Sequence, residues 1–171
     1  MGGSVGPLVA ADEYFTHRIV ETFASVSQTD HSWTEKVCLM AAARDGSLQI
    51  GFGFGKYVNR NVVDGYAGVA RGTEQWTVRT SRELAADPDS VDVGPIRYEI
   101  LEPLRLIRVV LELNDVQPVA FDLVLQCTVP CVTEEREDRR NLTRYRRTVD
   151  RIRYHQAGVV AGPGVETEAT R

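Results

Sequence analysis

Seven short segments with a two-residue hydrophobic period follow one another along this chain, and they constrain its fold more than any other feature. They span residues 36–44, 47–57, 62–71, 74–82, 94–102, 104–113 and 118–129. Turn-forming pairs separate neighbouring segments at Asp45-Gly46, Gly72-Thr73 and Asn114-Asp115. Alternation interrupted by tight turns is typical of antiparallel strands joined as hairpins. The sequence therefore predicts an all-β antiparallel meander.

A meander of this length must protect its open edges, which favours closure into a β-barrel or half-barrel. The chain has 171 residues, about the size of one domain. We expect residues 1–11 to form a flexible tail, 12–160 the β domain and 161–171 a frayed end. Helical spacing of apolar residues within 12–27 predicts a short N-terminal helix or arm before the first strand.

The stretch IGFGFGK, residues 50–56, alternates bulky and bare positions. It lacks the spacing of phosphate-binding glycine motifs, and no helix is expected after it, so we predict a strand and no nucleotide site. A two-residue turn at Asp45-Gly46 would pair Phe52 with Leu39 of the preceding strand on a core face. The glycines then leave the other face bare, so that the sheet can bend or a ligand, a backbone or a side chain such as Met40 can approach.

A polar cluster follows from the next hairpin. A two-residue turn at Gly72-Thr73 would place Tyr66 opposite Arg79 and Asp64 opposite Ser81, on the reverse of an apolar face. Asp64 and Tyr66 are the candidate catalytic acid or base, and Arg79 has the chemistry to orient a carboxylate or a carbonyl. An internal ion-pair network on a polar sheet face is the commoner meaning of such a cluster, because ion-pair networks are frequent outside active sites.

The composition argues against several classes of function. The formal net charge of −4 gives no general attraction to nucleic acids, and no apolar run approaches the length of a membrane span. The N-terminal sequence lacks the features of a signal peptide, so we expect a cytoplasmic protein. No metal or other cofactor is predicted, because the three histidines His17, His31 and His155 are far apart in sequence. The three cysteines Cys38, Cys127 and Cys131 lack CxxC spacing, and we interpret them as reduced and mostly buried.

Residues 136–153 are locally basic, with eight arginines against three acidic residues. A nucleic-acid strip would use such a segment, but a salt-bridged surface or an interface is the commoner meaning in an acidic protein, and we predict no nucleic-acid partner. The same segment fits either a helix or a strand, because its apolar residues satisfy both periods between 140 and 153.

An ordered series of motifs carries a family resemblance. It consists of Asp12-Glu13-Tyr14, Ser32-Trp33, GFGFGKYVNRNVVDGYAGVARGTEQWTVRTSREL (51–84), VGPIRYEILEPL (93–104), LELNDVQPVAFDL (111–123) and RYHQAG (153–158). Together these resemble the N-terminal half of the hydroxyneurosporene-synthase-like and AttH-like lipocalin-type proteins. The resemblance implies a lipocalin-like, calycin-type β-barrel or half-barrel, and it favours a strand around Arg153. Family chains are about twice as long, so residues 161–171 would lead toward a second barrel half.

The resemblance implies a domain that binds an apolar small molecule of isoprenoid, steroid, polyketide or acyl type. Related proteins act without cofactors as hydratases, cyclases or isomerases, so catalysis in secondary metabolism is one expectation. The alternative is a non-catalytic domain that docks a second barrel half, a partner chain or another copy of itself. The residues that we expect to bind a ligand are Tyr57, Asn59, Tyr66, Trp76, Arg79 and Ser81. An open interior reached by these residues would favour the first function, and a filled interior the second.

Overall fold

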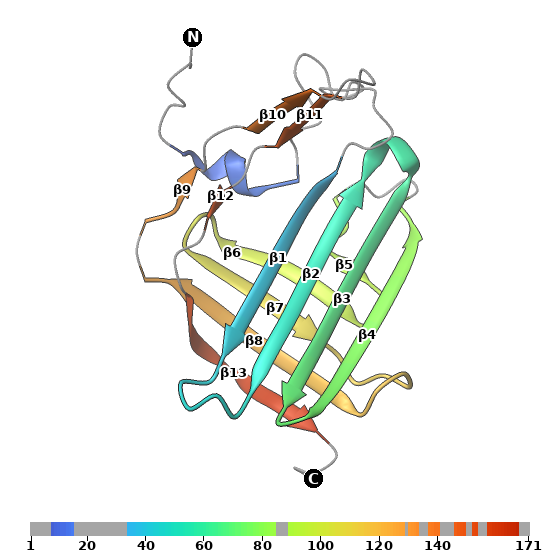
Figure 1. Cartoon of the computed structure of the whole chain (residues 1–171), viewed down its shortest axis with the longest axis vertical. Helices are drawn as coiled ribbons and strands as arrows, with labels where there is room; N and C mark the ends of the chain where they lie inside the picture. The colour runs from blue at the N-terminus through green and yellow to red at the C-terminus, as the bar shows by residue number, and fades with distance from the viewer. Residues whose placement is uncertain are drawn as a thin grey trace.

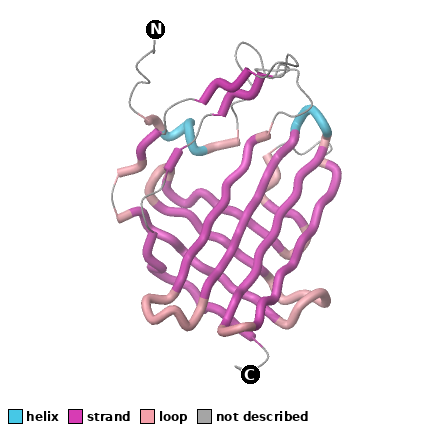
Figure 2. The backbone as a smooth tube through the Cα atoms, in the orientation of Figure 1, coloured by secondary structure: helices cyan, strands magenta, loops and turns pink. Residues whose placement is uncertain are grey.

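Two antiparallel sheets make up most of the fold, and their strands cross one another in Figure 1. The computed structural model describes residues 8–15, 34–84, 89–128, 130–133, 137–140, 146–149, 152–153 and 157–167. Figure 2 shows that strands dominate the described chain. The predicted all-β antiparallel meander is confirmed. Within these ranges no strand pairing joins the two sheets, which lie against each other face to face.

The first sheet follows the predicted hairpins. It contains β1 (Glu35–Ala42), β2 (Gln49–Tyr57), β3 (Val62–Arg71) and β4 (Glu74–Glu83), in that order. Leu39 pairs with Phe52, and Tyr66 pairs with Arg79, as the turn positions predict. Gly46 and Gly72 hold positive φ angles of 75° and 61° in the two turns, a conformation that favours glycine. The β2–β3 connection instead contains a 3-10 turn, η2 (Val58–Arg60).

The second sheet contains β5 (Asp92–Val93), β6 (Ile96–Glu102), β7 (Leu106–Leu111), β8 (Val119–Cys127) and β13 (Ala157–Thr167), paired in that order. Residues 161–167, where we expected a frayed end or the start of a second domain, belong to β13, which pairs with β8 as far as Thr167. Residues 168–171 lie outside the described part of the chain. The backbone hydrogen bonds of an added strand give this segment its partner, which composition alone did not indicate.

Two turns differ from their prediction. The expected strand 94–102 begins only at Ile96, because Gly94 has a φ of 57° and forms the turn between β5 and β6. The expected two-residue turn at Asn114-Asp115 is a longer loop. The Asn114 side chain accepts hydrogen bonds from the Val116 and Gln117 backbone N–H groups, at 3.0 and 2.9 Å. This side chain organises the loop and moves the β7–β8 register, so that Leu111 pairs with Phe121.

Short elements surround the sheets. In Figure 1 the ladder of β10 (Glu137–Arg140) with β11 (Arg146–Val149) lies above them, and β9 (Val132–Thr133) pairs with β12 (Ile152–Arg153). The structure therefore resolves the helix-or-strand alternative toward strands where it describes this segment. At the N-terminus it shows a 3-10 helix, η1 (Ala10–Glu13), so the expected tail is ordered at residues 10 and 11. Most of the expected helix or arm over 12–27, and residues 1–7 of the tail, lie outside the described residues.

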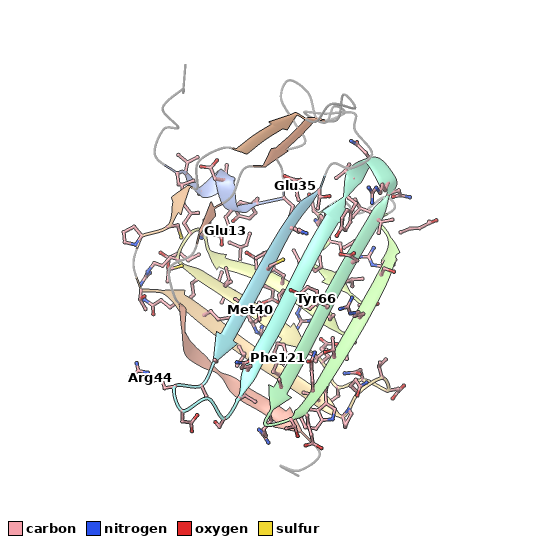
Figure 3. All side chains as sticks on the ribbon, viewed as in Figure 1. Glu13, Glu35, Met40, Arg44, Tyr66 and Phe121 are labelled. Carbon is pink, nitrogen blue, oxygen red and sulfur yellow. The ribbon has the colours of Figure 1, made fainter. Side chains whose placement is uncertain are left out.

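The core lies between the two sheets and is filled by side chains from both. Phe52 and Phe54 of β2 are fully buried, and they meet Tyr98 of β6 with ring centroids 6.4 Å apart in each case. Phe121 contributes from the sheet behind them (Figure 3). Phe15 adds a ring from the N-terminal segment, 5.7 Å from the ring of Phe54. The predicted apolar face of the first sheet is thus the core face, and its polar face is directed away from the core.

Candidate functional site

Three glycines of β2 form a bare strip along the outer face of the first sheet, the face directed away from the core. We call Gly51, Gly53 and Gly55 the glycine lane. Strand pairing places each glycine between a residue of β1 and a residue of β3. The flanking pairs are Met40 and Gly68, Cys38 and Tyr66, and Lys36 and Asp64. A side chain on β3 can therefore cross the lane toward β1 without meeting a Cβ atom.

The side chain of Tyr66 on β3 lies across the glycine lane. Its ring lies so close over Gly53 that a Cβ atom built there would be 2.2 Å from Cε1 of the ring. Figure 3 shows Tyr66 over the middle of the sheet. Burial and the neighbouring Cys38 thiol raise the pKa of the Tyr66 phenol, while Arg79 acts in the opposite direction. Tyr66 therefore remains protonated at neutral pH and is a hydrogen-bond donor rather than a base.

Tyr57 and Asp64 cover the next glycine. A Cβ atom at Gly55 would meet Asp64 Oδ1 and the Tyr57 hydroxyl, each at 3.2 Å. Burial raises the pKa of the Tyr57 phenol, and the Asp64 carboxylate, which hydrogen-bonds the phenol, raises it further. Tyr57 therefore also remains protonated at neutral pH, and part of the hydrogen-bonding capacity of Asp64 is used within the protein.

A depression of about 400 Å³ opens over this part of the outer face. Its volume falls in the range of small-molecule sites, roughly 300–1,000 Å³. Lys36 and Arg79 supply two exposed positive charges there, against the single carboxylate of Asp64. The depression is lined by Lys36, Val37, Cys38, Gly53, Phe54, Gly55, Tyr57, Asp64, Gly65, Tyr66, Arg79, Thr80 and Ser81.

The predicted site residues fall into two groups. The first group lines the depression and consists of Tyr57, Asp64, Tyr66, Arg79 and Ser81. The second group lies elsewhere. Trp76 pairs with Val69 and packs against the core on the opposite face of the sheet, because it is an odd number of residues from Arg79 along β4. Asn59 lies in the η2 turn, beyond the end of β2.

Among the lining residues that were not predicted as site residues, Lys36 and Cys38 contribute an ammonium group and a thiol. Their signal was present in the β1–β2 register, which the turn at Asp45-Gly46 predicted, and which places them beside Gly55 and Gly53. The expectation that the cysteines are mostly buried was wrong, since Cys38 is exposed and the other two are half-buried. The other suggested neighbour of the glycines, Met40, is 83% exposed at the edge of the lane.

The chemistry of the depression is that of a donor-rich, weakly cationic surface with two aromatic rings. Its phenols and its guanidinium group donate hydrogen bonds to oxygen atoms of a ligand. Across the described ranges, no three His, Cys, Asp or Glu side chains come together to hold a metal ion, and all three histidines lie outside those ranges. The helices in the described part of the chain are single 3-10 turns, too short to span a membrane.

Comparison with known proteins extends over nearly the whole chain. Residues 8–170 match a family described as a family of unknown function, DUF8625. Comparisons with curated proteins and with solved structures found no match. The matched range includes both sheets, the glycine lane and every residue of the depression. The chain therefore belongs to the DUF8625 family, whose function is unknown.

Proposed function

We propose that this domain binds a small molecule with a flat apolar body and one anionic group, in the depression on the outer face of β1–β4. The observation that carries the proposal is the arrangement of the Tyr66 ring, which lies on Gly53 beside Arg79. An aromatic ring held against the backbone provides a fixed apolar surface for a ligand. The guanidinium group beside it provides a partner for a carboxylate or a similar anion.

The resemblance to lipocalin-type proteins supports the same ligand classes, isoprenoid, steroid, polyketide or acyl, but the geometry favours a different place for them. Apolar side chains of both sheets fill the interior, which is the arrangement expected of the alternative docking function, so the ligand-binding proposal depends on the hollow of the outer face alone. Acidic polyketides and acyl chains combine an apolar body with an anionic group. These classes therefore fit the two tyrosines together with Lys36 and Arg79 best.

A catalytic form of this proposal uses the tyrosines as donors. The neutral phenol of Tyr66 beside Arg79 would polarise a carbonyl oxygen of a bound ligand, which promotes isomerisation or cyclisation. Asp64 would accept a proton only after its hydrogen bond with Tyr57 rearranges. Binding is therefore the primary function that we propose, and hydratase, cyclase or isomerase activity is its extension.

Two fluorescent dyes with similar aromatic bodies test the binding site. Anilinonaphthalene sulfonate carries an anionic group, and phenylnaphthylamine is neutral. Replacing Arg79 with glutamine should weaken binding of the anionic dye roughly three- to tenfold, because an exposed charge pair contributes about 1 kcal/mol. Binding of the neutral dye should not change. Tyr66→Ala should weaken binding of both dyes, because it removes the apolar surface.

Arg44→Gln is the matched control, since Arg44 is exposed at the β1–β2 hairpin and outside the depression (Figure 3). Circular dichroism would establish that each variant is folded. If folded variants of Arg79 and Tyr66 bind both dyes like the unchanged protein, the outer-face site is wrong. Native mass spectrometry of protein purified from its own host would then identify the chemical class of any natural ligand.

A second candidate function, docking of another copy of the chain on the same face, is favoured by one observation. Met40 is 83% exposed beside the glycine lane, where its side chain would add apolar contact area to an interface formed on this face. Sedimentation at increasing protein concentration would show a dimer that Met40→Asp disrupts. A monomer at all concentrations would remove this candidate and leave ligand binding.

A further inference from the structure

Two half-buried thiols lie together at the end of β8, far from the glycine lane along the chain. Cys127 is the last residue of β8, and Cys131 follows after three residues. Their Sγ atoms are 3.7 Å apart. A disulfide bond needs a separation of about 2.05 Å, so the two sulfur atoms must approach each other further before they can bond. The third cysteine, Cys38, lies on the first sheet and is exposed.

Backbone contacts hold both thiols against the β6–β7 turn. The Cys127 backbone N–H donates a hydrogen bond to the Arg105 carbonyl at 2.8 Å. The Cys131 thiol donates one to the Leu104 carbonyl at 3.2 Å. The backbone N–H of Leu104 in turn donates to the buried carboxylate of Glu13, the last residue of η1. The sulfur atoms are therefore kept close by the fold, in addition to their proximity in sequence.

We propose that Cys127 and Cys131 are a modification site, at which an oxidant of the disulfide class forms an intramolecular disulfide bond. With oxidised glutathione, the Cys127 thiolate attacks one sulfur of the glutathione disulfide and displaces one glutathione thiolate. The Cys131 thiolate then attacks Cys127 Sγ and displaces the second glutathione. Two protein thiols are oxidised, one glutathione disulfide is reduced to two thiols, and the two protons released by the cysteines end on glutathione.

The surroundings assign the order of these steps. Burial raises the pKa of both thiols, and the Glu13 carboxylate raises each pKa further. The pKa of Cys131 reaches about 12, and the Cys131 S–H group is already engaged in its hydrogen bond to the Leu104 carbonyl. Cys127 is therefore the first thiol to ionise and to attack. Both steps are slow at neutral pH because little thiolate is present, so the pair suits equilibration with the redox conditions around the protein rather than fast sensing.

Oxidation would also change the contacts of the β6–β7 turn. The disulfide has no S–H group, so the Leu104 carbonyl loses its thiol donor. Leu104 holds a positive φ of 61°, and its N–H group binds Glu13. The disulfide bond would therefore remove the thiol hydrogen bond of the β6–β7 turn, the turn that also binds Glu13 of the N-terminal segment. It would also link the end of β8 covalently to the segment that follows.

The test uses the full chain with Cys38→Ser, so that these two thiols are the ones that react. The protein is equilibrated in buffers with graded ratios of reduced to oxidised glutathione, then alkylated with iodoacetamide in urea, and its intact mass is measured. Urea exposes every remaining thiol, so lack of alkylation reports oxidation and not burial. We expect two alkylated thiols in reducing buffer, and a species without alkylation that is two hydrogens lighter in oxidising buffer.

Two variants serve as controls. In the Cys38→Ser background, Cys131→Ser and Cys127→Ser should each keep one thiol that is alkylated or carries glutathione. Peptide mapping of the oxidised unchanged protein should find the Cys127–Cys131 bond, a measurement that does not depend on any variant folding. The proposal is overturned if both thiols remain alkylated at every glutathione ratio. It is also overturned if oxidation stops at a glutathione adduct, or gives only bonds between chains or through Cys38.

Discussion

Replacing Gly53 with alanine tests whether the Tyr66 ring needs a residue without a Cβ atom beneath it. The added Cβ atom would be 2.2 Å from one carbon of the Tyr66 ring and 2.8 Å from two others. Carbon atoms in contact normally lie about 3.5–4.0 Å apart, so the ring must move by more than about 1 Å. The backbone of β2 is paired on both sides, to β1 and to β3, and it yields less easily than the ring. We therefore expect the Tyr66 ring to move away from its position over residue 53.

The expected cost combines two opposing terms. Alanine in a strand is favoured over glycine by about 0.5–1 kcal/mol, because the unfolded chain loses less conformational freedom. Overpacking at Tyr66 costs about 1–3 kcal/mol. The net prediction is a loss of about 1–2 kcal/mol in the free energy of unfolding for Gly53→Ala. Gly51→Ala is the matched control, since its Cβ atom would meet Tyr66 at an ordinary 3.8 Å, and it should be neutral or slightly stabilising.

Urea unfolding followed by circular dichroism measures both free energies, and thermal unfolding should show a fall in Tm of about 2–4 °C per kcal/mol. A double-mutant cycle isolates the cause. With Tyr66→Ala already present, Gly53→Ala should lose its penalty, which gives a coupling energy of about 1 kcal/mol or more. Equal stability of the two glycine variants, or an unchanged penalty without the Tyr66 ring, would refute the reasoning.

Two further predictions concern packing and charge in the folded chain. Phe15→Ala should reduce the free energy of unfolding by about 2 kcal/mol in urea titrations, because its half-buried ring contacts the rings of Phe54 and Tyr98; no loss would mean that the N-terminal segment does not stabilise the core. Asp122→Asn should cost about 1 kcal/mol at pH 7, because Asp122 accepts two hydrogen bonds from Arg108, at 2.7 and 2.5 Å. Arg108 holds the pKa of Asp122 below its usual value, so this stabilisation is present above about pH 4, the unfolded pKa, and is lost as the pH falls through the folded pKa. Unfolding curves between pH 7 and 2 should therefore converge for the two proteins, and a constant difference would contradict the assignment.

Part of the candidate site could be predicted from hairpins alone. The Gly72-Thr73 turn fixes the β3–β4 register, so Tyr66 and Arg79 were placed together correctly. The crossing of Tyr66 over Gly53 could not be predicted, because it also needs the β2–β3 register. That register is set by the η2 turn and Asn61, which has a φ of 57°, and no two-residue turn signal marks this connection. Trp76 lies on the apolar face of β4, as the β3–β4 register predicts, and this face packs against the filled core and not against the outer depression.

The sequence by itself determined the strands and the hairpin pairings of the first sheet, such as Leu39 with Phe52. Alternation and turn residues act between neighbours in the chain, and a short turn transmits the register to the whole hairpin. The tertiary structure alone decided which partner covers a strand and what lies over a bare face. The pairing of β13 with β8, the contact of Glu13 with Leu104, and the Tyr66 ring on Gly53 each join segments that no short turn connects. Such contacts depend on packing between sheets and across three strands, which a local two-residue period does not encode.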